Sequence, residues 1–375
     1  MSADLYGSTR SLLNALPELA ASFRLTVVFP NRGPAVEEAE ACGASVLVLP
    51  DFALRRRYAR ARAFPAWLGS FITSFRRLRR LHRSHPFDLV YSNTLAVALG
   101  PLLAVMLRIP HILHMRECPR TPPWAPKVLL RMARLSSDLV ICNSNSTRAF
   151  LIQYEPEIEP KSVVIYNGIE IPSSLPNSPA VDALRVCCVA RIHPTKGHAV
   201  LFEAAHLARN ASSRWELHLY GDILPEHESL RAELLAKIRE YGLEGWVHWH
   251  GFVDDTAAVY RDADVCVVPS VVPEAFSLVC VEAQSRCLPV VATAPGGPAE
   301  IIIDGESGYL VPPEDPAALA DAVRRLERDP ALRQRMGERG RQRMLAHFSR
   351  EVYAAKVRAA CEQVTALSGR RSGTT

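Results

Sequence analysis

The sequence predicts an α/β protein with doubly wound parallel sheets, and three observations lead to this fold class. Asp264–Val268 (DVCVV) and Leu288–Thr293 (LPVVAT) are short apolar runs that enclose a loop and a helix-length segment, which is the order and size of a βαβ unit. Neither run alternates with polar residues, so both strands should be buried on both faces of a parallel sheet. Similar runs recur along the chain with helical patterns between them, as alternating strands and helices require.

Bulk composition favours a globular protein of the reducing cytoplasm. The 375 residues suffice for two or three domains. The nine cysteines are scattered without a C-x-x-C pair, which argues against a disulfide framework or a zinc site. Leu95–Leu107, the longest apolar run, is too short to span a bilayer, and Met1–Ala20 lacks the features of a signal peptide. The net charge of +5 is too small to imply a nucleic-acid partner.

The start of the chain lacks the strand with which a doubly wound domain normally opens. A turn at Tyr6–Ser8 comes almost at once, and a helix is expected over Arg10–Phe23. Two explanations remain open. Either translation begins upstream of Met1, which we favour, or the first sheet lacks its central strand.

The other elements of the first half follow from apolar runs bounded by turn residues. Strands are expected at Leu25–Phe29, Ala44–Leu49, Asp88–Tyr91, Pro110–Met115, Asp138–Cys142 and Val163–Ile165. Helices are expected at Ala35–Ala41 and directly after two polar capping segments, Ser92–Thr94 and Asn143–Thr147.

The segment Phe52–Phe87 is unusually basic, with ten arginines and no acidic residue. From Trp67 onward its apolar residues recur at steps of three and four, which predicts an amphipathic helix. Basic and aromatic residues together favour docking on an anionic lipid surface. A solvated basic face on a core-packed helix is the alternative. RNA is disfavoured because no nucleic-acid fold signature accompanies the arginines.

Composition also indicates domain boundaries. Residues 1–172 are expected to form an N-terminal domain, residues 173–183 a linker rich in Pro and Ser, and residues 184–349 a C-terminal domain. A helix over residues 350–367 and a disordered tail over 368–375 should follow. The second half adds expected strands at Leu184–Ala190, His218–Gly221 and Val247–Val253, and helices at Asp315–Arg328 and Pro330–Phe348.

Two carboxylates give the βαβ unit of Asp264–Thr293 its chemical interest. Glu274 follows the end of the first strand, where ligands of open α/β sheets bind. Glu282 lies eight positions further on, in the helix. Between them, Ala275–Leu278 supplies backbone N–H groups at the helix start, which suit an anion. A sugar nucleotide, with hydroxyls at both ends and phosphates between, matches this layout. Two solvated helix glutamates are the alternative.

From Gly251 to Leu319 the chain resembles the retaining nucleotide-sugar glycosyltransferases of family 4, which have the GT-B fold. The family's Glu-x7-Glu motif matches Glu274 and Glu282. The other matching positions are Ala263–Val265, Pro269–Ser270, Val279–Ala283, Pro289–Thr293, Gly296–Gly297, Glu300, Asp304–Gly305, Gly308 and Leu310–Val311. Two positions depart, since Ser277 and Cys287 stand where members usually have Gly. Ser277 keeps the N–H that a phosphate would contact.

The resemblance, which is weaker over the rest of the chain, implies the GT-B architecture. Two Rossmann-like doubly wound domains would face each other across a cleft, here with the first strand of the N-terminal domain missing. The helix over residues 350–367 would return to pack on the N-terminal domain.

The resemblance also implies roles for individual residues. Glu274 would hold the sugar, while Arg191 and Lys196, in a segment similar to the family's Gly-Arg-x4-Lys-Gly, would stabilise the leaving diphosphate. Glu282 would hold the ribose. The remaining donor contacts are expected from Ala275, Phe276, Ser277, Leu278, Gly221 and Phe252. The acceptor-side residues are expected to be Gly7, His114, Arg116 and Glu117, with a purely structural His114 as the alternative.

The implied activity is transfer of a sugar from a nucleoside-diphosphate sugar to a glycan or lipid-linked acceptor, with retention of configuration, in polysaccharide or glycolipid biosynthesis. No cofactor, no metal and no nucleic-acid partner are expected. The protein should be cytoplasmic and peripheral on the inner face of the membrane through Phe52–Phe87. A non-catalytic sugar-nucleotide-binding subunit and a sugar-nucleotide epimerase remain alternatives. A nicotinamide dehydrogenase is disfavoured because no G-x-G-x-x-G follows a strand.

Overall fold

The computed structural model describes residues 7–50, 64–175, 183–223, 227–253 and 255–372. The chain divides into two compact units. The first unit comprises the chain up to Glu170 together with the chain from Ser349 on, and the second unit is Ile171–Phe348. Each unit is an α/β body around parallel strands, which confirms the predicted fold class.

The described part of the first unit contains six strands. They are β1 (Thr26–Phe29), β2 (Ser45–Val48), β3 (Val90–Ser92), β4 (His111–Met115), β5 (Leu139–Cys142) and β6 (Ser162–Val164). Its helices are α1 (Gly7–Ser22), α2 (Pro34–Ala41), α3 (Phe64–Ser84), α4 (Leu99–Leu107), α5 (Ala125–Ser136), α6 (Asn145–Tyr154) and α14 (Arg350–Ser372). Strand β4 is buried along its whole length and forms the centre of the core.

The strands of the first unit form two sheets rather than one. β1 pairs with β2, and β3, β4, β5 and β6 pair in that order, every pair being parallel. Within the described residues no strand precedes α1. This is the arrangement expected of a doubly wound sheet that lacks a central strand.

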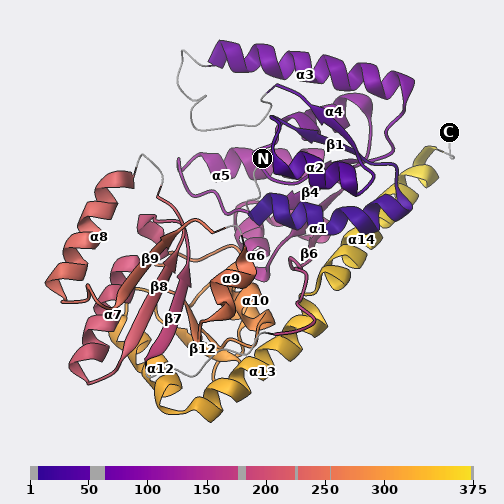
Figure 1. Ribbon diagram of the computed structural model, residues 1–375. Coiled ribbons are helices and arrows are strands. Elements are labelled where there is room, and N and C mark those ends of the chain that lie inside the picture. Colours follow the sequence, from indigo (N-terminus) through magenta and orange to yellow (C-terminus); the bar gives the residue numbers. More distant parts are fainter. Residues whose placement is uncertain (1–6, 51–63, 176–182, 224–226, 254, 373–375) are drawn as a thin grey trace. The chain divides into compact units, whose positions relative to one another are not determined.

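The last helix of the chain belongs to the first unit. In Figure 1 the yellow α14 runs beside the indigo α1, and the two helices pack together. Ala15 and Leu19 of α1 share a buried cluster with Tyr353 and Val357 of α14. The helix continues to Ser372, so residues 368–372, which we expected in a disordered tail, are helical.

The second unit has a six-stranded parallel sheet in the order β12-β11-β10-β7-β8-β9. Its strands are β7 (Leu184–Val189), β8 (Trp215–Tyr220), β9 (Val247–Gly251), β10 (Val265–Val268), β11 (Val290–Thr293) and β12 (Gly308–Val311). Its helices are α7 (His198–Asn210), α8 (Glu228–Glu240), α9 (Thr256–Arg261), α10 (Leu278–Ser285), α11 (Pro298–Ile301), α12 (Pro316–Arg328) and α13 (Pro330–His347).

The strand order of the second unit reverses between β7 and β10. The chain moves outward from β7 through β8 and β9, while β10, β11 and β12 extend the sheet on the other side. An ion pair between the buried Arg185 and the half-buried Asp264, 3.1 Å from Nε to Oδ2, joins the two central strands at their amino ends. Ligands of open α/β sheets bind outside the carboxyl ends of the strands at such a reversal.

Two further observations concern the chain as a whole. All nine cysteines are free thiols. Among the described residues, no helix combines the length and the apolarity needed to cross a bilayer.

The start of α4 lies several residues beyond the predicted position. α4 begins at Leu99, not directly after Ser92–Thr94. The Ser92 hydroxyl is bonded to Nε2 of His111 at 2.9 Å, and the Thr94 hydroxyl is engaged by the Glu117 carboxylate and by the backbone N–H of Ala96. Both side chains serve the surrounding structure, so neither caps the helix.

Candidate active site

Two loops meet at the carboxyl ends of β7 and β10. The first runs from Arg191 to Gly197, and the second from Pro269 to Ser277. The backbone N–H of Val271 donates to the carbonyl of Thr195 at 3.0 Å. Gly197 has φ +72°, and a Cβ placed there would lie 1.8 Å from the Pro269 carbonyl oxygen. Only glycine permits this approach of the two backbones.

The loops bring Lys196 and Glu274 together. Nζ of Lys196 lies 2.5 Å from Oε1 of Glu274, and the Ser270 hydroxyl donates to the same oxygen at 2.6 Å. Burial raises the pKa of Glu274, but the charge of Lys196 and the hydrogen bonds outweigh it, so the pKa is lowered overall. The carboxyl group is therefore an ionised acceptor at neutral pH, fixed in one orientation.

The end of β11 and the loop that follows it hold the backbone around Glu274 in place. Gly297 donates its N–H to the Glu274 carbonyl at 2.8 Å, and Thr293 donates its hydroxyl to the carbonyl of Ser270 at 2.6 Å. Gly296 has φ +126°, and a Cβ there would stand 2.8 Å from the Glu274 carbonyl oxygen. These positioning roles were not assigned from the sequence, although Ser270 and both glycines stood among the motif positions.

The second carboxylate, Glu282, lies about one turn into α10. It accepts a hydrogen bond from the Tyr260 hydroxyl at 2.9 Å. Burial and the charge of Glu282 both raise the pKa of Tyr260, so the phenol remains a donor. The guanidinium of Arg286 lies over the Tyr260 ring at 5.2 Å. Tyr260 and Arg286 were also not predicted as part of this site.

The start of α10 lies between the two carboxylates in the chain. Ser277 is the buried N-cap residue, Leu278 opens the helix, and Ala275 and Phe276 are half-buried just before it. The first-turn N–H groups of a helix have no partner within the helix, and the helix dipole adds partial positive charge there. An anion is therefore favoured at this point.

The remaining predicted donor residues lie at the same edge of the sheet. Arg191 is exposed and follows β7, and Gly221 follows β8 with φ +138°. Phe252 follows β9 with a side chain that is 58% exposed, and its backbone N–H is held by Oδ1 of Asp222 at 3.1 Å. An exposed aromatic ring at this edge is available to a planar ligand.

In the first unit, Arg116 is the centre of a buried polar network. Its guanidinium donates to Oδ1 of Asn93 at 2.9 Å, to Oδ1 of Asn167 at 2.5 Å and to the Tyr353 hydroxyl at 2.9 Å. A fourth contact joins it to Nδ1 of His114 at 3.2 Å. Arg116 is only 8% exposed, so in this structure its charge is used inside the unit.

The network fixes the tautomer of His114. A guanidinium can only donate, so Nδ1 of His114 accepts from Arg116 and also from the Tyr91 hydroxyl at 2.5 Å. The ring proton must then be on Nε2, which is buried and has no hydrogen-bond partner among the described residues. Burial and the charge of Arg116 lower the pKa of His114, so the ring stays neutral.

The other two acceptor-side residues lie beside this network. Glu117 accepts from the Arg116 backbone N–H at 3.2 Å, and burial raises its pKa. Gly7 is the exposed first residue of α1. The backbone carbonyl of the next residue, Ser8, accepts a hydrogen bond from Nδ2 of Asn93 at 2.9 Å. Asn93 therefore joins the start of α1 to Arg116, a connection that the sequence did not reveal.

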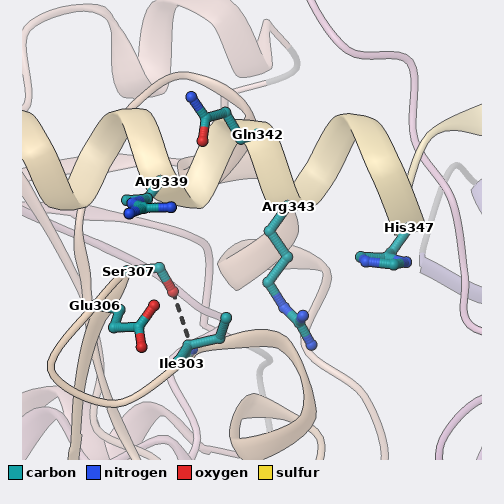
Figure 2. Close-up of a pocket in the computed structure, with 7 residues that line it drawn as sticks. All are labelled: Ile303, Glu306, Ser307, Arg339, Gln342, Arg343 and His347. Atoms are coloured by element: carbon teal, nitrogen blue, oxygen red, sulfur yellow. Dashed lines mark hydrogen bonds between the residues drawn. The ribbon is translucent and has the colours of Figure 1, made fainter.

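A cavity of about 220 Å³ lies elsewhere in the second unit, and none of the predicted site residues is among those that line it. Figure 2 shows α13 crossing over the loop of Ile303 to Ser307, with Arg339 and Arg343 extending toward that loop. Arg343 donates to the carbonyls of Glu300 and Ile301, each at 2.8 Å. Its hydrogen bonds therefore tie α13 to the end of α11, which directly precedes the loop.

Family models match both halves of the chain. Residues 6–171 match the family described as Glycosyltransferase Family 4, and residues 176–343 match the family described as Glycosyl transferases group 1. The boundary between the two matches lies close to the division between the two units.

Curated relatives cover most of the chain. An alpha-maltose-1-phosphate synthase of Mycobacterium tuberculosis is 30% identical over 290 residues, which are 69% of this chain and 75% of that protein. A lipopolysaccharide core biosynthesis mannosyltransferase, LpcC of Rhizobium leguminosarum, is 28% identical over 271 residues, 70% of this chain and 74% of that protein.

Solved structures agree over nearly the full length. Anabaena HepE in complex with UDP-glucose is similar with a TM-score of 0.82 at 22% identity, covering 97% of this chain and 98% of that chain. Sucrose-phosphate synthase from Thermosynechococcus elongatus gives a TM-score of 0.74 at 23% identity, covering 94% and 92%. At such identities the likeness establishes the fold alone.

Proposed function

The chain belongs to glycosyltransferase family 4, and with this family as the premise we propose that it transfers a hexosyl group to a glycan or lipid-linked acceptor in polysaccharide or glycolipid biosynthesis. It is a retaining glycosyltransferase that uses nucleoside-diphosphate sugars as donors. The names of its relatives, which include a lipopolysaccharide core mannosyltransferase, support an acceptor of this kind.

The meeting of Lys196, Glu274 and the start of α10 at the sheet reversal carries this proposal. The diphosphate leaves with growing negative charge, and Lys196, Arg191 and the N–H groups at Ala275–Leu278 stabilise that charge. Preorganised groups of this kind are worth several kcal/mol in a transition state. Lys196 bridges the Glu274 carboxylate and the phosphates, while Glu274 accepts hydrogen bonds from the sugar hydroxyls.

The two ends of the donor are held by separate groups in this proposal. Glu282 accepts from the ribose hydroxyls, and the pair with Tyr260 keeps that carboxylate in place. The backbone at Gly221 and the ring of Phe252 contact the base. The acceptor binds in the first unit near Gly7 and Glu117, while His114 and Arg116 act through the buried network.

Charge stabilisation by side chains and a helix start makes a metal ion unnecessary for the transfer. Activity should therefore survive treatment with EDTA. Loss of activity on chelation, with recovery in magnesium or manganese, would refute this part of the proposal.

A donor screen tests the function directly. The unfolding midpoint of the protein would be measured with uridine-, guanosine- and adenosine-diphosphate sugars, since a ligand that binds the folded state raises the midpoint by mass action. The donor that binds would then be incubated with lipid-linked and glycan acceptors. Transfer with retained anomeric configuration is expected. Donor binding without transfer to any acceptor would instead favour a non-catalytic sugar-nucleotide-binding subunit.

A further inference from the structure

A cluster of imidazoles lies on the outer part of the second unit's sheet. Glu216 and His218 alternate on β8 with the buried Trp215 and Leu217, so both project from the face opposite to those core residues. His248 and His250 alternate in the same way on β9, the edge strand. The register places His218 directly opposite His248.

The side chains of this cluster converge. One ligand atom from each of Glu216, His218 and His248 can be chosen so that the three lie within 4.8 Å of one another. Nε2 of His218 lies 3.6 Å from Oε2 of Glu216. That nitrogen is buried and has no hydrogen-bond partner within the described part of the chain, and a buried polar atom without a partner is costly.

The other ring nitrogen of His218 is already positioned. Nδ1 lies 3.0 Å from Nε2 of His250, and the planes of the two rings are only 10° apart, as an N–H···N bond in the ring planes requires. When His218 donates its Nδ1 proton to His250, Nε2 presents a lone pair toward Glu216. A histidine that binds a metal through one nitrogen and donates the other N–H to a neighbour is the usual arrangement in metal sites.

We propose that Glu216, His218 and His248 form a binding site for a divalent transition-metal ion of the Zn²⁺ class, with His250 as the residue that orients His218. Imidazole nitrogens with one carboxylate oxygen suit this class of ion, and water would complete the tetrahedron. Ligand atoms around a tetrahedral Zn²⁺ are about 3.3 Å apart. The site therefore closes by rotation of the exposed His248 and of Glu216, which is 43% exposed.

The position of the cluster indicates that a bound metal would stabilise the sheet. His218 precedes Gly221 by three residues, about 10 Å along a strand, so the metal site is separate from the predicted donor residues. A metal bound there would link β8 to the edge strand β9. The bound metal would stabilise the second unit but would take no part in sugar transfer. Chelation should therefore lower the unfolding midpoint of the protein and leave its transferase activity unchanged.

The test uses full-length protein, purified without a histidine tag and freed of metal by a chelator. Calorimetric titration with Zn²⁺ should show one site in the wild type. The double variant His218→Ala/His248→Ala should lose that site, and His250→Ala should weaken it about 10–100-fold, as for other orienting residues. His85→Ala is the matched control, because the His85 side chain is exposed on the first unit and is hydrogen-bonded to the neighbouring Ser84 hydroxyl.

Two further measurements keep the test decisive if the double variant does not fold. The single variant His248→Ala changes only an exposed side chain, and it should still lower the affinity at least ten-fold. Co²⁺ in place of Zn²⁺ should give the visible absorption of a tetrahedral ion without a thiolate charge-transfer band. No Zn²⁺ binding at micromolar concentration, unchanged affinity in His248→Ala, or a thiolate band would overturn the proposal. None of these outcomes bears on donor binding.

Discussion

Single residues at the candidate site have separable effects, because Lys196 and Glu282 are assigned to the nucleotide while Glu274 is assigned to the sugar. We expect Lys196→Ala and Glu282→Ala each to weaken donor binding. Loss of a charge-assisted hydrogen bond costs about 1.5–3 kcal/mol, which is roughly a 10–150-fold rise in Kd. We expect Glu274→Ala to lower kcat mainly.

These effects would be measured by donor titration and by steady-state kinetics of the three variants. Lys237→Ala, on α8 of the same unit, serves as a control for the loss of one lysine and should behave as the wild type. Unchanged Kd and kcat in all three site variants would refute the assignment of the site.

Another residue-level prediction concerns His111, which is buried at the start of β4. It is bonded to the Ser92 hydroxyl at 2.9 Å and to the Ser136 carbonyl at 3.0 Å. Burial lowers its pKa from 6.5 to about 4. The unfolded chain therefore takes up a proton at a higher pH than the folded one. The contribution of neutral His111 to the free energy of unfolding is complete above pH 6.5. It falls by about 3 kcal/mol as the pH decreases toward 4.

The measurement is chemical unfolding at several pH values between 7.5 and 4. His111→Asn should give a shallower loss of stability across this range than the wild type, whatever its stability at neutral pH. His85→Asn, at an exposed position, should leave the slope unchanged. Equal slopes in the wild type and His111→Asn would contradict the prediction.

Among the elements, α3 carries the predicted docking on an anionic membrane surface, and it exposes both apolar and basic side chains. Trp67, Phe71 and Leu78 are buried against the first unit, while Phe64 is 50% exposed and Leu68 and Ile72 are each 40% exposed. The exposed arginines of the same helix are Arg76, Arg77, Arg79, Arg80 and Arg83. Residues 52–63 of the basic segment, with its other five arginines, lie outside the described residues.

We expect the protein to co-sediment with anionic vesicles but not with neutral ones. Each arginine near an anionic surface contributes up to ~1 kcal/mol, and salt should weaken binding by screening. Replacing Arg76, Arg77, Arg79 and Arg80 by Gln should release the protein. A matched variant with Arg231, Arg239, Arg328 and Arg335 of the second unit changed to Gln should still bind. Failure of the wild type to bind at low salt would contradict this prediction.

The elements also explain which parts of the fold could be predicted. β7, β10 and β11 are within two residues of their expected ranges, because short, mainly apolar runs that end at polar or turn-forming residues identify buried parallel strands. The predicted start of α4 was wrong. The segment Ser92–Thr94 has the composition of a helix cap, but its hydroxyl groups are hydrogen-bonded to residues outside α4. Local sequence does not specify long-range partners.

The candidate site, like the fold, has parts that the sequence predicts and parts that it does not. Glu274, Glu282 and Lys196 could be proposed from motif spacing and from their places after strands. The bonds from Ser270 to Glu274 and from Tyr260 to Glu282 depend on how loops fold against each other. The imidazole cluster was missed for a similar reason. His248 and His250 alternate visibly, but only the register of β8 with β9 brings Glu216 and His218 to them.

At the scale of the whole molecule, the first unit is discontinuous in sequence, and α14 completes it. Tyr353 and Val357 fill the cluster with Ala15 and Leu19, and Tyr353 accepts from Arg116. We expect a chain ending at Phe348 to lose a stably folded first unit, while the second unit, Ile171–Phe348, stays folded because it is continuous. Limited proteolysis should leave a fragment that corresponds to the second unit.

A shorter truncation after Leu367 is the control, since it keeps Tyr353, Val357 and the other members of this cluster. It should resist protease like the full chain. A truncation at Phe348 whose first unit also resists protease would contradict the prediction.

The return of α14 to the first unit also determines the order in which a newly made chain can mature on the ribosome. Synthesis proceeds from the amino end, and domains generally fold as they emerge. The first unit here emerges first but must wait for a helix that follows the whole second unit. The part of α1 that contacts α14, which includes Ala15 and Leu19, therefore stays uncovered during translation of the intervening residues 171–348. The unit whose synthesis begins first is therefore completed last, and its uncovered apolar surface is prone to aggregation until α14 has been made.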